Sequence, residues 1–128
     1  MAYDIGKTLD TSPEKARERA VEALSAEGFG VLTEIDVQAT MKKKLDRDMR
    51  YYTILGACNP KMAWQALGHE PKIGAMLPCN VVVRELEDGK VEVSAVDPQA
   101  SMQAVENPEL GEVAGEVRAR LQKVIDAV

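Results

Sequence analysis

The only two cysteines of the chain each stand beside an asparagine and a proline. The two segments are Cys58-Asn59-Pro60 and Pro78-Cys79-Asn80. The first cysteine ends one predicted strand and the second opens another, and strand ends expose reactive groups more readily than strand centres do. A helix that begins at Pro60 favours a thiolate at Cys58, because helix N-termini carry a positive partial charge. We therefore take Cys58 and Cys79 as the leading thiol candidates.

The ordinary interpretation of both cysteines is that they are small buried hydrophobic residues. Two-thiol chemistry requires Cα atoms about 4.4–6.8 Å apart. The predicted loop 69–78 spans up to roughly 33 Å when extended. It is long enough to fold back and lay Cys79 beside Cys58 on antiparallel strands. A parallel crossover would instead leave the two thiols at opposite edges of the sheet, and the sequence leaves both arrangements open.

The same residues predict a site without covalent chemistry. Free backbone amides at the start of the helix after Asn59, with the Asn59 and Asn80 side chains, would bind a small anion. The simpler interpretation is that Asn59 caps the helix and that Pro60 is its first residue. Both interpretations place the site at the Cys58 and Cys79 end of the sheet.

A metal site is a weaker alternative. Cys58, His69 and Cys79 would supply three ligands, with Asp97 as a distant fourth. These spacings match no zinc motif, and His69 lies in a Gly-His-Glu-Pro segment typical of a surface loop. We therefore predict no metal, and the sequence identifies no cofactor.

Composition excludes several classes of protein. The chain has 128 residues, of which 45% are hydrophobic and 29% charged, and its net charge is -5. These values are typical of one globular domain, which we place at residues 1–128. The negative charge argues against nucleic acid and anionic membranes as partners. We find no signal peptide or membrane-spanning stretch, so we expect a cytoplasmic protein with reduced thiols.

Hydrophobic periodicity predicts five strands and four helices. The predicted strands are Tyr3–Leu9, Phe29–Ile35, Arg50–Cys58, Cys79–Leu86 and Val91–Val96. The predicted helices begin after caps at Ser12 (or Thr11), Asp36, Asn59 and Asn107. The order β-α-β-α-β-α-β-β-α predicts an α+β, two-layer sandwich: a mainly antiparallel five-stranded sheet with helices on one face. The segments 69–78 and 97–107 are predicted to be loops.

Two further features lie on predicted helices. Trp64 is predicted to anchor packing, although a half-exposed tryptophan there would suit an interface. Lys42-Lys43-Lys44, with Arg47 and Arg50, forms a basic island in an acidic chain. A solvated helix face is the ordinary explanation, and a phosphate-bearing partner is the alternative.

The chain resembles domain-of-unknown-function family 302. The resemblance covers nearly the whole chain and is carried by the Ser/Thr-Pro-Glu helix start and by two longer segments. These are Ile54-Leu-Gly-Ala-Cys-Asn-Pro60 and Ile73-Gly-Ala-Met-Leu-Pro-Cys-Asn-Val-Val-Val83. The resemblance implies a compact α+β fold with an antiparallel sheet, often crystallised as a pair of chains. It implies no activity, because none is established for the family.

Two functions follow as hypotheses. The first is a small binding or interaction module with a pocket near Cys58 and Cys79. The second is a thiol-dependent redox or stress-related enzyme that uses the same two cysteines. An open five-stranded sheet has two free edges, so we also expect a homodimer formed through the strand around Ile5 or the hairpin strand Val91–Val96.

Overall fold

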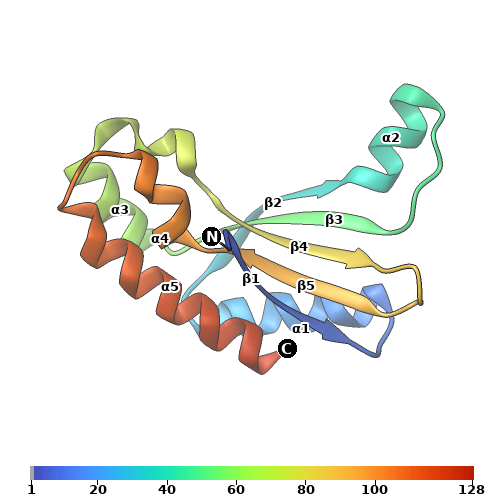
Figure 1. Ribbon diagram of the computed structural model, residues 1–128. Helices are drawn as coiled ribbons and strands as arrows, with labels where there is room; N and C mark the ends of the chain where they lie inside the picture. The colour runs from blue at the N-terminus through green and yellow to red at the C-terminus, as the bar shows by residue number, and fades with distance from the viewer. Residues whose placement is uncertain (1) are drawn as a thin grey trace.

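The computed structural model describes residues 2–128 and contains one five-stranded sheet with helices packed on one side (Figure 1). The strands are β1 (Asp4–Leu9), β2 (Gly30–Asp36), β3 (Tyr52–Cys58), β4 (Cys79–Glu85) and β5 (Val91–Val96). The α-helices are α1 (Pro13–Ala26), α2 (Val37–Leu45), α3 (Pro60–His69), α4 (Pro98–Ser101) and α5 (Leu110–Ala127). Two 3₁₀ helices, η1 (Pro71–Met76) and η2 (Met102–Ala104), complete the described elements.

The sheet is antiparallel throughout, with the strand order β1-β5-β4-β3-β2. Its free edges are therefore β1 and β2. Figure 1 shows α1 and α5 against one face of the sheet, with α3 and α4 gathered at one end. The predicted α+β class and the antiparallel five-stranded sheet are confirmed.

Local sequence signals start three of the helices where they were predicted. Ser12 Oγ accepts a hydrogen bond from the Lys15 backbone N–H at 3.2 Å, ahead of Pro13. An Asp36 carboxylate oxygen accepts from the N–H of Ala39 at 2.9 Å. Each bond satisfies a backbone donor that has no partner inside its helix. Asn59 caps α3 in the same way, as described below.

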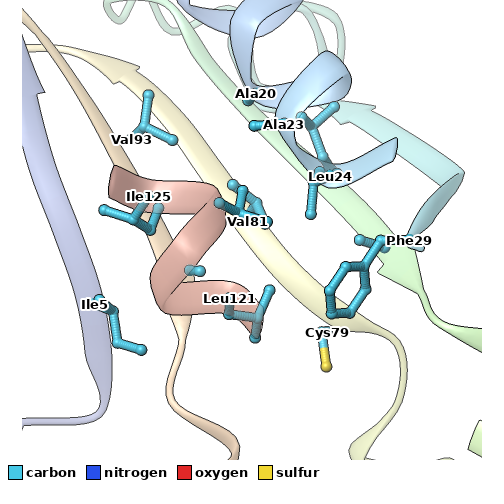
Figure 2. Packing of buried hydrophobic residues seen from close by; sticks show 14 of the residues in the cluster. Ile5, Ala20, Ala23, Leu24, Phe29, Cys79, Val81, Val93, Leu121 and Ile125 are labelled. Atoms are coloured by element: carbon cyan, nitrogen blue, oxygen red, sulfur yellow. The ribbon is translucent and has the colours of Figure 1, made fainter. Parts of the chain in front are cut away.

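The core fills the space between the sheet and the two long helices (Figure 2). Alternate residues of β1, β3, β4 and β5 point toward the helices, and Val81, Val83 and Val93 are fully buried. Leu24 of α1 and Leu121 of α5 are also fully buried against them. The buried side of α5 therefore lies on the sheet.

The Lys7 side chain, on the helix-covered face of β1, links this strand to the end of α5. Lys7 Nζ donates to the carbonyl oxygens of Val128 at 2.7 Å, Asp126 at 3.2 Å and Ile125 at 3.3 Å. The last carbonyls of a helix have no partner inside the helix and carry its negative partial charge. Lys7 therefore stabilises the C-terminal turn of α5 and fixes it over β1.

Two predicted loops contain short helices. Residues 71–76 of the loop 69–78 form η1, and α4 and η2 lie within the loop 97–107. Short helical turns of this kind close with local i→i+3 hydrogen bonds and need little hydrophobic periodicity. In addition, α3 continues past Gly68 to His69 instead of ending at Leu67.

Two expectations about surfaces are wrong. Trp64 is 80% exposed rather than a packing anchor, because Met62 and Ala66 occupy the buried side of α3. At 100° per residue, a position midway between them points to the opposite side of the helix. The hairpin strand β5 lies between β1 and β4, so it presents no free edge for pairing with a second chain.

The helix α2 projects from the sheet rather than covering it (Figure 1). None of its residues is buried. Its chain reverses at Asp46, whose φ of 52° is left-handed, and returns to β3. We call residues 32–50, which include α2 and its flanks, the α2 arm.

Candidate functional site

The segment between β3 and β4 folds back, so the two cysteines lie at neighbouring strand ends. Cys79 is the register partner of Ala57 on β3, one residue from Cys58. Cys58 in turn pairs with Gly30 at the start of β2. The antiparallel arrangement is therefore the one adopted, and the parallel crossover is excluded.

The two thiols have different surroundings. Cys79 is buried, whereas Cys58 is half-buried, and neither forms a disulfide. Burial raises the pKa of the Cys79 thiol to about 11, and the nearby Cys58 adds to the rise. A thiol with such a pKa stays protonated at neutral pH and is a poor nucleophile. Cys58 is therefore the better-placed thiol for reaction with a reagent from solvent.

Both cysteines line an apolar cavity of about 40 Å³ at the end of the sheet. Its wall combines the ends of β3 and β4 with α3, the start of α5 and the segment that contains α4 and η2. The lining residues are Phe29, Ala57, Cys58, Asn59, Met62, Ala63, Ala66, Leu77, Pro78, Cys79, Pro98, Met102, Leu110, Val113, Ala114 and Val117. Asn59 is the only one of them with a side-chain amide, and none carries a formal charge.

The size and chemistry of this cavity limit what it can accept. Its volume exceeds the roughly 10–15 Å³ that one water molecule needs. A buried water also needs two to four polar partners, and this wall offers few. Met62 and Met102 have flexible thioether side chains that adapt their shape to a neighbour. The cavity therefore suits a small apolar group better than water or an ion.

The residues predicted to bind an anion do not converge. Asn59 Oδ1 accepts from the Met62 backbone N–H at 3.4 Å, and Asn59 Nδ2 donates to the Glu27 carbonyl at 3.4 Å. Asn59 thus caps α3, with Pro60 as its first residue, and holds α3 against the end of α1. Asn80 is exposed, and strand alternation places it on the sheet face opposite to Cys79. Only Asn59 of the two asparagines lines the cavity.

An ion pair fastens the segment that covers the cavity. The Asp97 carboxylate accepts from Arg118 Nε of α5 at 3.1 Å and also from the backbone N–H of Gln99 at 2.9 Å. Asp97 therefore caps α4 and anchors it to α5 at the same time. This places Pro98 and Met102, which follow, over the cavity.

His69 and Asp97 have other partners than the two cysteines. His69 Nδ1 lies 3.0 Å from a Glu109 carboxylate oxygen, at the junction of α3 and α5. Among residues 2–128, no group of three or more His, Cys, Asp or Glu side chains is placed to hold a metal ion. The same residues contain no helix that is long and apolar enough to span a bilayer.

Sequence reasoning located one wall of the cavity and missed the others. The sequence predicted a helix after Asn107 and helices on one face of the sheet, but helical periodicity alone does not show which strand ends a helix reaches. The contribution of Met102 depends on the fold of the segment 97–107, which was predicted to be a loop. The Asp97-Pro98 pair was the available signal, since Asp followed by Pro is a common helix start.

Comparison with known proteins identifies the family. The sequence model described as "Domain of unknown function DUF302" matches residues 5–128. A crystal structure of an uncharacterized conserved DUF302 protein from Bacillus stearothermophilus is similar, with a TM-score of 0.93 and 28% identity over 99% of this chain and 98% of that one. No curated protein matches the chain. The chain therefore belongs to the DUF302 family.

Proposed function

We propose that this protein is a binding module that accepts a small apolar ligand in the cavity beside Cys58 and Cys79. The observation that carries the proposal is the composition of the cavity wall, which is apolar and built from four different parts of the fold. Ligand sites are concave and mainly apolar, with few polar groups that orient the ligand. Here the Cys58 thiol is such a polar group.

The geometry supports an apolar ligand over the small anion expected from the sequence. An anion needs free donors or a positive charge, and no lysine or arginine lines the cavity. Both the nitrogen and the oxygen of the Asn59 side-chain amide already form hydrogen bonds within the protein. Transfer of an unpaired charge into apolar surroundings costs several kcal/mol, whereas each buried CH₂ group contributes about 0.8 kcal/mol.

The covering segment is the proposed route of entry. Pro98 and Met102 lie over the cavity, and the Asp97–Arg118 ion pair is the polar tie between this segment and α5. Displacement of Met102, whose side chain is half-buried, would enlarge the cavity without disturbing the sheet. With a cavity of about 40 Å³, we expect the ligand to be a short alkyl chain, or a single ring when Met102 is displaced.

Methyl NMR titration with cyclohexane and benzene tests the proposal, with inorganic phosphate as the anionic comparison. We expect saturable shifts of the Met62, Met102 and Val113 methyl signals with the apolar probes, and none with phosphate. Ala66→Leu, which fills the cavity from α3, should abolish these shifts. Ala39→Leu on the exposed α2 adds the same atoms elsewhere and should not.

Ala63→Leu provides a second cavity-filling variant if Ala66→Leu does not fold. Two results would contradict apolar binding. One is the absence of saturable shifts with either apolar probe. The other is equal shifts in the cavity-filling variants and in Ala39→Leu.

A thiol-dependent redox or stress-related activity is the second function we propose for the same end of the sheet. The observation that favours it is that both cysteines line the same cavity at neighbouring strand ends. The test is a thiol count before and after mild oxidation. Reversible loss of two thiols in a monomer would support a redox function. Two thiols that stay unreactive would rule this function out.

We also propose that the protein is cytoplasmic and forms a homodimer. The two free cysteines support a reducing compartment. The free edges of the sheet, β1 and β2, support self-association.

A further inference from the structure

The α2 arm carries apolar side chains that the rest of its own chain does not cover. Leu32 is 68% exposed, Leu45 64% and Ile35 48%. None of the nine residues of α2 is buried. Helices of this length are marginal in water, and protein helices gain most of their stability from packing an apolar face. The arm therefore has the features of a segment that packs against a surface outside its own chain.

The strand β2, whose last five residues belong to the arm, is also open on one side. β2 pairs with β3, and it has no other neighbour in the sheet formed by the described residues. Its outward backbone donors and acceptors are available to another strand. The arm and the free edge of β2 are continuous, so a single partner would cover both.

Two segments at opposite ends of the molecule carry opposite net charge. Residues 37–50 of the arm contain five basic residues and only two acidic ones. At the other end, where α5 begins, residues 106–116 contain four glutamates and no basic residue, and all four glutamates are exposed. Figure 1 places α2 and the start of α5 at opposite ends of the sheet. The basic segment 37–50 of one molecule is therefore complementary in charge to the acidic segment 106–116 of another.

The acidic end also has an exposed apolar patch. On α3 Trp64 is 80% exposed and Leu67 42%, and Met76 at the end of η1 is 39% exposed. Exposed tryptophan is enriched at protein interfaces and dominates their binding energy. Each end of the molecule thus combines apolar side chains with charge, and the charges are opposite.

β2 connects these two ends. Its first residue, Gly30, pairs with Cys58, next to the cap of α3, and its last residue, Asp36, caps α2. A two-fold axis through the middle of β2 would pair it antiparallel with the same strand of a second chain. The axis would then bring each arm to the α3 end of the partner, so both contacts form twice in a closed dimer.

We propose that two copies of this chain associate through their β2 edges, with the α2 arm of each packed on the α3 and α5 end of the other. The proposal rests on the homodimer proposed above and assigns its surface. Leu45 and Trp64 are central to it, and the lysines of the arm face the glutamates at the start of α5. The β1 edge, with Tyr3 beside it, stays outside the interface.

Sedimentation velocity over micromolar concentrations tests this assignment. Leu45→Asp and Trp64→Asp should each weaken the dimer by about tenfold or more, as expected of central interface residues. Tyr3→Asp is the matched control, because Tyr3 is 74% exposed but lies beside the β1 edge. It should leave the dimer intact. Glu112→Lys should weaken the dimer, and Lys43→Glu in the same chain should restore part of the loss.

Several results would overturn the assignment. A protein that stays monomeric at high micromolar concentration would rule out both the homodimer and the interface assigned to it. A dimer that Tyr3→Asp dissociates, or that neither Leu45→Asp nor Trp64→Asp weakens, uses a different surface. The methyl NMR titration is measured on the same variants, so loss of the dimer is distinguished from loss of ligand binding.

Discussion

Cys79 and Ala57 are register partners across β3 and β4, which places the Cys79 thiol one residue from Cys58 at the wall of the cavity. Only Cys58 of the two is partly open to solvent. We predict that one thiol per chain reacts rapidly with a disulfide reagent at pH 8, and that Cys58→Ser removes this fast phase. Denaturant should make the remaining thiol reactive. A fast phase that persists in Cys58→Ser would show that Cys79 is accessible.

Stability should depend on the Cys79 proton at high pH. Because burial raises its pKa from 9.0 to about 11, the folded protein holds this proton more tightly than the unfolded chain does. The resulting stability is fully present below pH 9 and is lost as the pH rises through 11. The loss amounts to about 2–3 kcal/mol in the free energy of unfolding.

Urea unfolding at pH 8 and pH 11, compared between the wild type and Cys79→Ala, measures this loss. The wild type should lose more stability than the variant across this range, since other groups that titrate here are common to both proteins. An equal loss in the two proteins would show that the Cys79 thiol does not contribute.

Gly56 on β3 has no room for a side chain. A Cβ atom there would overlap Thr33 Oγ1 on β2 and would come 2.9 Å from Pro78 Cγ. We predict that Gly56→Ala lowers the free energy of unfolding by about 2 kcal/mol, the usual cost of overpacking. Thr33→Ala should restore part of this loss, because it removes the hydroxyl but leaves the Pro78 contact. An additive effect of the two substitutions would contradict this explanation.

Lys7 should contribute to stability through the end of α5. Its ammonium group donates to the Val128 carbonyl at 2.7 Å and to two further carbonyls of the same turn. Replacement by methionine keeps most of the apolar stem and removes the charge. We predict a loss of about 1 kcal/mol in chemical denaturation, smaller at high salt. Lys15→Met on α1 is the control, and an equal loss there would assign the effect to charge in general.

Local signals account for the part of the fold that the sequence predicts well. The caps Ser12, Asp36 and Asn59 each act within a few residues, so their positions follow from residue type. The return of Cys79 to Cys58 depends on the direction of a long connection, and chain length alone allowed both directions. The sequence therefore located the two cysteine segments but did not determine their spatial relationship.

The two wrong expectations about surfaces, those for Trp64 and β5, have a different cause. Trp64 was predicted to anchor packing, although Met62 and Ala66 already define the buried side of α3. β5 was one of the two strands expected at an edge, but β1 and β4 pair with its two sides. Pairing between distant strands leaves no trace in local periodicity. For the same reason the sequence did not show that α2 would project without burying any residue.

Xenon-pressurised crystals provide the most direct measurement of the central claim, that the cavity beside the two cysteines accepts apolar ligands. Xenon occupies apolar protein cavities that water leaves empty. We predict a xenon peak between Cys79, Met62 and Val113 in the wild type, and none there in Ala66→Leu. A cavity without xenon in wild-type crystals that bind it elsewhere, or one filled by ordered water, would contradict the claim.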